Sequence, residues 1–276
     1  MIKDIVVNLS LGDNGGIVAN YAISVAEAFN AHLAGIAFVF DPIVPVSGIG
    51  YVPPEVIDMQ VADNQSSSKA AVDRFSAAAS GAGISAESIS LNASAAGSGE
   101  RFGHIARRFD LAIVGQADPE ANSIEEIIAE STLFESGRPM IVVPYIQKGP
   151  LKLDLIMVCW DGSRPAARAI ADAMPFLEKA KRVELVIVSN DGGKKDEIEG
   201  ADMGQHLARH GLNVEVKRID NADIDIADAL LSHAADSGAD FIVMGGYGHS
   251  RLREFVLGGV THSILRSLTV PALLSH

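Results

Sequence analysis

Short apolar runs alternate along the chain with stretches whose apolar residues recur at helical spacing. The first half begins with "KDIVVNL" (3–9), continues with the helical "IVANYAISVAEAFNA" and then reaches a second apolar run, "HLAGIAFVF". Continuous apolar runs of this kind are typical of parallel strands that are buried on both faces. Their alternation with helices through short connections predicts βαβ units in a doubly wound, Rossmann-like α/β fold.

The same order of elements occurs again from Leu153. There "LDLIMVCW", the turn "DGS", the helical "RPAARAIADAMPFLEKA" and "RVELVIVS" follow one another. The ends of the halves also match, because "DLAIVG" and "RPMIVVPY" correspond to "DFIVMG" and "VPALLSH". In the helical stretch of the second half, Ala167, Ile170, Ala171 and Met174 recur at helical spacing and are expected to share one face.

The repeat predicts two tandem α/β domains, residues 1–147 and 152–276. Each domain should contain a five-stranded parallel sheet and about four helices. The joint between them is "YIQKGPLKL", in which Gly149 and Pro150 interrupt regular structure.

The composition permits a large core and disfavours two classes of partner. Apolar residues make up 48% of the 276 residues, and the formal net charge of -13 argues against binding to nucleic acid. Cys159 is the single cysteine, so no intrachain disulfide and no Cys-rich metal site is expected. The N-terminal residues lack a secretory signal pattern, and no apolar run approaches the roughly 18–20 residues of a membrane-spanning helix. We therefore expect a cytoplasmic protein without a membrane partner.

Ligands of open parallel sheets bind beyond the carboxyl ends of the strands, where the strand order reverses. In the second half, "DGS" (161–163) follows the first strand and "GGYGHSRLREFVLGG" (245–259) follows the fourth. "DGS" has two interpretations. Ser163 can cap the next helix while Asp161 and Gly162 form a turn, or Asp161 can accept hydrogen bonds from a ribose.

The glycine-rich stretch also has two interpretations. Glycines let backbone N–H groups approach an anion, and a helix N-terminus adds partial positive charge. Gly245 and Gly248 after a strand, with Gly258 and Gly259 before a helix, therefore fit a phosphate site. The alternative is a flexible turn, since the spacing is neither a Walker A motif nor GxGxxG.

The spacing Gly245-x2-Gly248-x9-Gly258 resembles the G-x2-G-x9-G-[ST] signature of the ATP-binding branch of the universal stress protein family. The "DGS" turn, the element order and "VPALL" are similar too, and the two copies resemble the tandem members of that family. The resemblance is specific in the second half and weak in the first. It implies an adenine nucleotide alpha hydrolase-like fold, ATP or another adenine nucleotide with Mg²⁺ as cofactor, and an intrachain pseudo-dimer with the two terminal strands side by side.

Carried over residue by residue, the resemblance implies a nucleotide site in the second half. Asp161 would contact the ribose or adenine side, and the glycines would donate backbone N–H groups to phosphates. The implied set is Cys159, Asp161, Val188, Met244, Gly245, Gly248, Gly258, Gly259, Val260 and Thr261. Gly259 departs from the signature, which has Ser or Thr there, so a phosphate-binding hydroxyl would have to come from Thr261.

The first half departs much further from the signature. Ser10 stands at the position of Asp161, Asp118 at that of Gly248, and Glu126 at that of Gly258. Carboxylates at the mouth of a phosphate site repel the ligand, so we predict that the first half does not bind ATP. Residues 41–56, "DPIVPVSGIGYVPPEV", are expected to form a surface loop, with a lid or partner surface as the alternative.

The leading hypothesis is a non-catalytic protein of the stress response that binds ATP, ADP or AMP and whose state is sensed by a protein partner. The alternatives are a nucleotide-free interaction scaffold and a very slow ATPase. We assign no catalytic residue and no metal ligand from the sequence. His206 and His210, four residues apart on an expected helix, are interpreted as a solvated pair rather than a zinc site. Pairing of two chains into a homodimer is left open.

Overall fold

The computed structural model describes residues 1–12, 15–42, 53–117, 124–189, 200–220, 225–246 and 259–276. The first half contains β1 (Asp4–Asn8), α1 (Gly15–Phe29), β2 (His32–Phe40), α2 (Pro54–Ala82), β3 (Ala86–Ala93), α3 (Ser98–Ala106), β4 (Leu111–Gly115), α4 (Ile124–Glu135) and β5 (Met140–Val143). The second half contains β6 (Leu155–Cys159), α5 (Arg164–Leu177), β7 (Arg182–Ser189), α6 (Ala201–Arg209), β8 (Val214–Asp220), α7 (Ile226–Ser237), β9 (Phe241–Gly245), α8 (Gly259–Ser267) and β10 (Ala272–Ser275).

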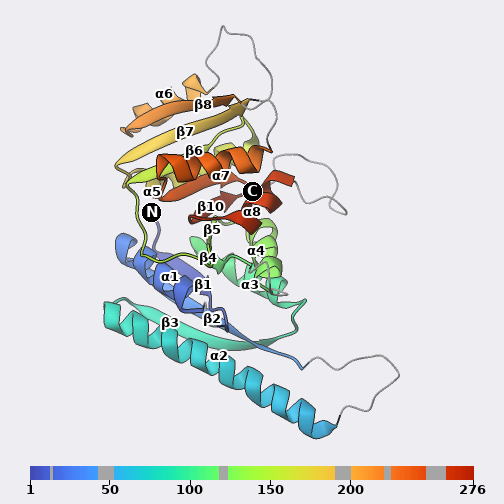
Figure 1. The fold of residues 1–276 in the computed structure, drawn as a ribbon. Coiled ribbons are helices and arrows are strands. Elements are labelled where there is room, and N and C mark those ends of the chain that lie inside the picture. The colour runs from blue at the N-terminus through green and yellow to red at the C-terminus, as the bar shows by residue number, and fades with distance from the viewer. Residues whose placement is uncertain (13–14, 43–52, 118–123, 190–199, 221–224, 247–258) are drawn as a thin grey trace.

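The strands form one ten-stranded sheet in the order β3-β2-β1-β4-β5-β10-β9-β6-β7-β8 (Figure 1). Neighbouring strands within each half are parallel, whereas β5 and β10 are antiparallel. The predicted five-stranded parallel sheets are therefore confirmed. The two sheets are joined edge to edge through the terminal strands, as the family resemblance implies, with Ile141 opposite Leu273.

Helices cover both faces of the sheet. One core cluster joins the strands to α1, α2, α5 and α6, and a second joins them to α3, α4, α7 and α8. Along β1, Ile5 and Val7 belong to the first cluster and Val6 to the second, because successive side chains of a strand point to opposite faces. Burial on both faces is why the strands are visible in the sequence as continuous apolar runs.

An aspartate at the equivalent position of each half anchors the start of the central strands. The carboxylate of Asp110 accepts hydrogen bonds from the backbone N–H groups of Lys3 and Asp4, at 2.8 and 3.1 Å. In the second half, the carboxylate of Asp240 accepts hydrogen bonds from Asp154 and Leu155, at 3.1 and 3.0 Å. The internal repeat therefore extends to individual hydrogen bonds.

The helix predicted from the spacing of its apolar residues is confirmed as α5, but only part of the predicted face is buried. Ile170 is in the core and Met174 packs against it, whereas Ala167 and Ala171 are exposed. The other buried residues of the helix include Ala169 and Ala173. Alanine occurs on both sides of this helix, so the hydrophobic pattern does not distinguish them.

Helix α2 begins at Pro54, inside the stretch 41–56 that was expected to be a loop. Proline is favoured in the first turn of a helix, where its missing N–H has no intrahelical partner. The expectation is therefore wrong for the end of that stretch, and residues 43–52 lie outside the described residues. Figure 1 shows α2 running along β2 and β3. Among the described residues, no helix has the length and apolar character needed to cross a membrane.

Contacts between the halves continue on both sides of the β5–β10 pair. On one face, the ring of Phe29 on α1 packs edge-on against Phe176 on α5, with 4.7 Å between centroids. Phe176 also stacks on Phe241 of β9, at 5.3 Å. On the other face, the amide of Gln116 donates to the carbonyl oxygen of Leu265, at 3.0 Å.

Candidate functional site

The strand order of the second half reverses between β6 and β9. From β6 the chain continues to β7 and β8 on one side, while β9 leads to β10 on the other. Val158 lies opposite Val243 in this pair, so Cys159 and Met244 follow on adjacent strands at the carboxyl end. Ligands of open parallel sheets bind at this position.

Asp161 and Ser163 form a capped turn between β6 and α5. The carboxylate of Asp161 accepts a hydrogen bond from the N–H of Ser163, at 2.9 Å, and the Ser163 hydroxyl accepts one from the N–H of Ala166, at 3.2 Å. Gly162 between them has a φ of +72°, which glycine adopts at little cost. The turn interpretation of "DGS" is confirmed. Asp161 is also exposed at the strand edge, so its carboxylate is accessible there.

Gly245, the last residue of β9, lies directly against the first turn of α5. A Cβ atom at this position would be 2.6 Å from the carbonyl carbon of Pro165 and would also collide with the backbone nitrogen of Ala166. Glycine is therefore required here by packing alone. The close approach also brings the strand end and the capped turn of Asp161 together.

Four predicted residues gather on one side of the sheet. Met244 belongs to the core cluster that includes α7 and α8, and Cys159, Val188 and Val260 pack against that cluster. These side chains come from β6, β7, β9 and α8 and are buried or half-buried on that face of the sheet. Burial raises the pKa of the Cys159 thiol to about 12, with a further contribution from the charge of Asp161. The thiol is therefore protonated at neutral pH and is not an activated nucleophile.

The remaining predicted residues lie in and before α8. The helix begins at Gly259, and Thr261 in its first turn is buried, with 5% of its surface exposed. Gly248 and Gly258 lie outside the described residues. The structure therefore describes both ends of the glycine-rich stretch, at Gly245 and Gly259.

The equivalent edge of the first half is built from different side chains. Ser10 is buried, and its Oγ lies 3.3 Å from the position of a Cβ on Gly115, the last residue of β4. The Cγ of Glu125 lies 3.9 Å from the same position. Gln116 is buried and joins β4 to the other half through its hydrogen bond to Leu265. Glu126 lines a cleft with Gly115 and Gln116 at the same strand end, and it faces His262 of the second half.

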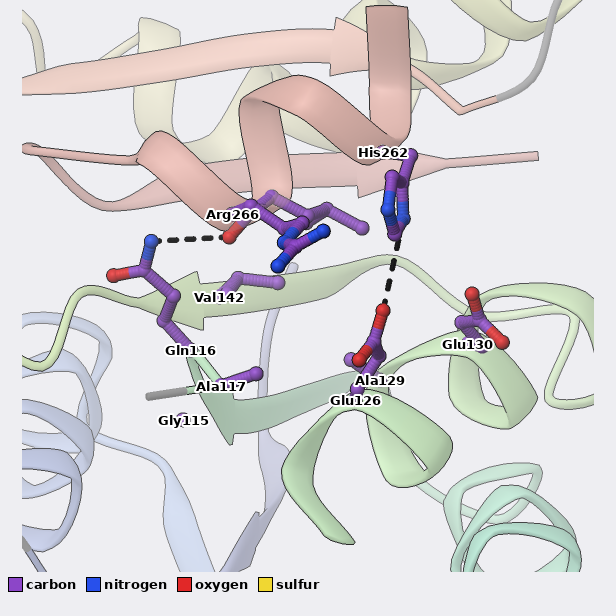
Figure 2. A pocket seen from close by; sticks show the side chains of 10 residues that line it. Gly115, Gln116, Ala117, Glu126, Ala129, Glu130, Val142, His262 and Arg266 are labelled. Atoms are coloured by element: carbon purple, nitrogen blue, oxygen red, sulfur yellow. Dashed lines mark hydrogen bonds and ion pairs between the residues drawn. The ribbon is translucent and has the colours of Figure 1, made fainter. Parts of the chain in front are cut away.

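A group of side chains that could hold a metal ion lies between the halves, and it was not expected from the sequence. Glu126 and Glu130 of α4 and His262 of α8 each offer a ligand atom, and these atoms lie within 4.8 Å of one another. Figure 2 shows the imidazole of His262 directed toward the carboxylate of Glu126, across a cleft that Arg266 also lines. Glu126 and Glu130 are four residues apart, but His262 comes from the other half of the chain, so no local spacing reveals the group.

Comparison with known proteins identifies relatives of both the sequence and the fold. Residues 153–276 match the model of the universal stress protein family. The Universal stress protein Slr1230 of Synechocystis sp. is 24% identical over 172 residues, which cover 60% of this chain and 57% of that protein. The match thus spans little more than half of that relative's length.

Solved structures of universal stress proteins share the architecture. The universal stress protein from Archaeoglobus fulgidus DSM 4304 superposes with a TM-score of 0.71 at 18% identity, covering 99% of this chain and 96% of its own. A universal stress protein solved in complex with cAMP matches 52% of this chain and 98% of its own, at 15% identity and a TM-score of 0.36. The second half thus matches the universal stress protein family in sequence, and the duplicated fold of the whole chain is similar to that of a solved universal stress protein.

Proposed function

We propose that the second half binds an adenine nucleotide, ATP, ADP or AMP, without converting it, and that the first half does not. The observation that carries this proposal is the position of Asp161 and Gly245 beside the two strands at which the strand order reverses. The spacing Gly245-x2-Gly248-x9-Gly258 supports it, because it connects that strand end to the start of α8.

Each part of the edge has a role in this proposal. One carboxylate oxygen of Asp161 is held by the Ser163 N–H, and the other would accept a hydrogen bond from a ribose hydroxyl. The apolar side chains of Cys159, Val188 and Met244, which are buried or half-buried on one face of the sheet, would lie on the adenine side of the ligand. The glycine N–H groups and the positive end of the α8 dipole would hold the phosphates, together with Mg²⁺. A protein partner would sense the bound state during stress.

The corresponding strand edge of the first half would instead hold the two halves together. Its strand edge holds Ser10, Glu125 and a Gln116 amide that bonds across to the second half. A phosphate there would meet the Glu125 carboxylate, which repels it. In this proposal the strand edge of the second half binds a ligand, whereas that of the first half contacts the second half.

Calorimetric titration of the full chain with ATP, ADP and AMP tests the proposal. We expect one nucleotide per chain, and loss of binding in Gly248→Val, whose side chain would block approach to the backbone N–H groups. Asp161→Asn should weaken binding at least about tenfold, the loss of one charge-assisted hydrogen bond. The matched first-half variants Asp118→Val and Ser10→Ala should bind as the unmodified protein does. Absence of binding at millimolar nucleotide would refute the proposal and favour the scaffold alternative.

A further inference from the structure

Glu126, Glu130 and His262 meet where the two halves of the chain face each other. The Nδ1 of His262 lies 3.6 Å from an Oε1 of Glu126, and the third donor, from Glu130, completes a group within 4.8 Å. Glu126 and Glu130 are one helical turn apart on α4, so their side chains project from the same face. His262 approaches them from α8 of the other half (Figure 2).

The separations suit a single cation. Ligand atoms around one tetrahedral Zn²⁺, bound at about 2.0–2.2 Å, are roughly 3.5 Å apart. The Glu126–His262 distance already has that value. The remaining donor, Glu130, needs to move by about 1 Å, which rotation of its partly exposed side chain supplies.

The electrostatic environment of the group also favours a cation. Two glutamate carboxylates held one turn apart on α4 repel each other when both are ionised, and a divalent ion removes that repulsion. Arg266, one turn beyond His262, lines the same cleft and offsets part of the negative charge.

The site depends on the pairing of the two halves. Leu273 follows Ile141 by the same number of residues as His262 follows Glu130. Ile141 and Leu273 lie opposite each other in the antiparallel β5–β10 pair. Glu130 and His262 therefore occupy equivalent positions of the two repeats and meet near the pseudo-twofold axis.

We propose that Glu126, Glu130 and His262 form a binding site for a divalent transition-metal cation such as Zn²⁺, which links α4 of the first half to α8 of the second. Imidazole nitrogen favours zinc and its transition-metal neighbours over Mg²⁺, and carboxylate oxygens complete the set. Three protein ligands leave a fourth position for water. His262 directly follows Thr261 in the first turn of α8, but none of the three donors belongs to the proposed nucleotide set, so the metal site does not depend on the proposed function.

Calorimetric titration of the full chain, prepared without an affinity tag or nucleotide, with ZnCl₂ at pH 7.5 tests this site. We expect one zinc ion per chain and a rise in the melting temperature on binding, because the ion binds the folded protein. Glu130→Gln and His262→Gln should each weaken binding at least about tenfold, and MgCl₂ at the same concentration should give no signal.

Control variants separate this site from other zinc donors. His206 and His210 lie with their ring centroids 4.8 Å apart and are the obvious competing pair. The double variant His206→Gln/His210→Gln should keep the zinc affinity of the unmodified protein, as should Asp161→Asn. Unchanged binding in Glu130→Gln, or loss of binding in the His206/His210 variant, would overturn the proposal. Melting of each variant in EDTA shows whether it folds; if His262→Gln does not, Glu130→Gln decides.

Discussion

Gly245→Ala tests the close contact on which the geometry of the candidate site depends. The added methyl group would lie 2.6 Å from the carbonyl carbon of Pro165 and would collide with the backbone nitrogen of Ala166. These atoms belong to the first turn of α5, so relief requires a shift of the helix rather than of a side chain. Overpacking of this kind costs about 1–3 kcal/mol, and the backbone partners place Gly245→Ala at the upper end of that range.

The matched control is Gly115→Ala at the end of β4, the equivalent position of the first half. There the nearest atoms are Val18 Cγ2 at 3.1 Å and Ser10 Oγ at 3.3 Å, and both side chains can move by a few tenths of an ångström. We expect a loss below about 1 kcal/mol. Both substitutions restrict the unfolded chain equally, so this contribution cancels between them.

Urea unfolding followed by the fluorescence of Trp160, the only tryptophan, measures both variants. Thermal unfolding should show a melting temperature lower by roughly 4–12 °C for Gly245→Ala, at about 2–4 °C per kcal/mol for a chain of this size class. Equal losses in the two variants, or no loss in Gly245→Ala, would refute the argument that α5 packs on the backbone of β9.

Three further substitutions test packing, helix propensity and charge. Phe176→Ala should destabilise the chain by about 3–5 kcal/mol, and a double-mutant cycle with Phe29→Ala should give a coupling of about 0.5–1.5 kcal/mol if these rings join the halves, measured by urea unfolding. Gly81→Ala, inside α2 with no atom within 4 Å of the new methyl group, should raise stability by about 0.5–1 kcal/mol; a loss would contradict the helical assignment. Thermal unfolding in EDTA across a pH series tests the charge of Glu130. At neutral pH, the free energy of unfolding of Glu130→Gln should exceed that of the unmodified protein by at most about 1 kcal/mol. The pKa of Glu130 is raised in the folded state, so its ionisation destabilises the fold as pH rises above the unfolded pKa; the gain should therefore disappear in acid, and a gain that persists there would contradict this cause.

Sequence patterns located the inner strands because these strands are buried on both faces, whereas the edge strands β3 and β8 are exposed or half-buried and have no such apolar run. Runs such as Ile5 to Val7 contribute to cores on both faces, so every position is apolar. Helix α2 gives a weaker signal, because Ala71, Phe75 and Ala79 are its buried apolar residues and most of its surface is polar. In α5, alanines on both sides conceal which face is buried. Elements with a small or alanine-rich buried face therefore need tertiary information.

The candidate site was predictable only where its residues follow strands directly. Asp161 and Gly245 follow or end apolar runs, so the rule for parallel sheets places them at one edge without coordinates. The group of Glu126, Glu130 and His262 depends instead on the register of β5 against β10, which no local pattern specifies. Glu126 was expected at this edge of the first half, and it lines a cleft with Gly115 there; its ion pair with His262 was not expected.

Tandem duplication explains how such a group can arise near a twofold axis. In a symmetric dimer of identical subunits, equivalent positions that meet near the axis carry the same residue. In this chain the two positions have diverged to Glu130 and His262, which supply different donor atoms to one place. The two strand edges differ for the same reason. The second half has the glycine spacing, whereas Gln116 of the first half forms a hydrogen bond across the junction. Covalent linkage of the repeats thus lets the junction acquire chemistry that an exactly symmetric dimer of either half alone would not have.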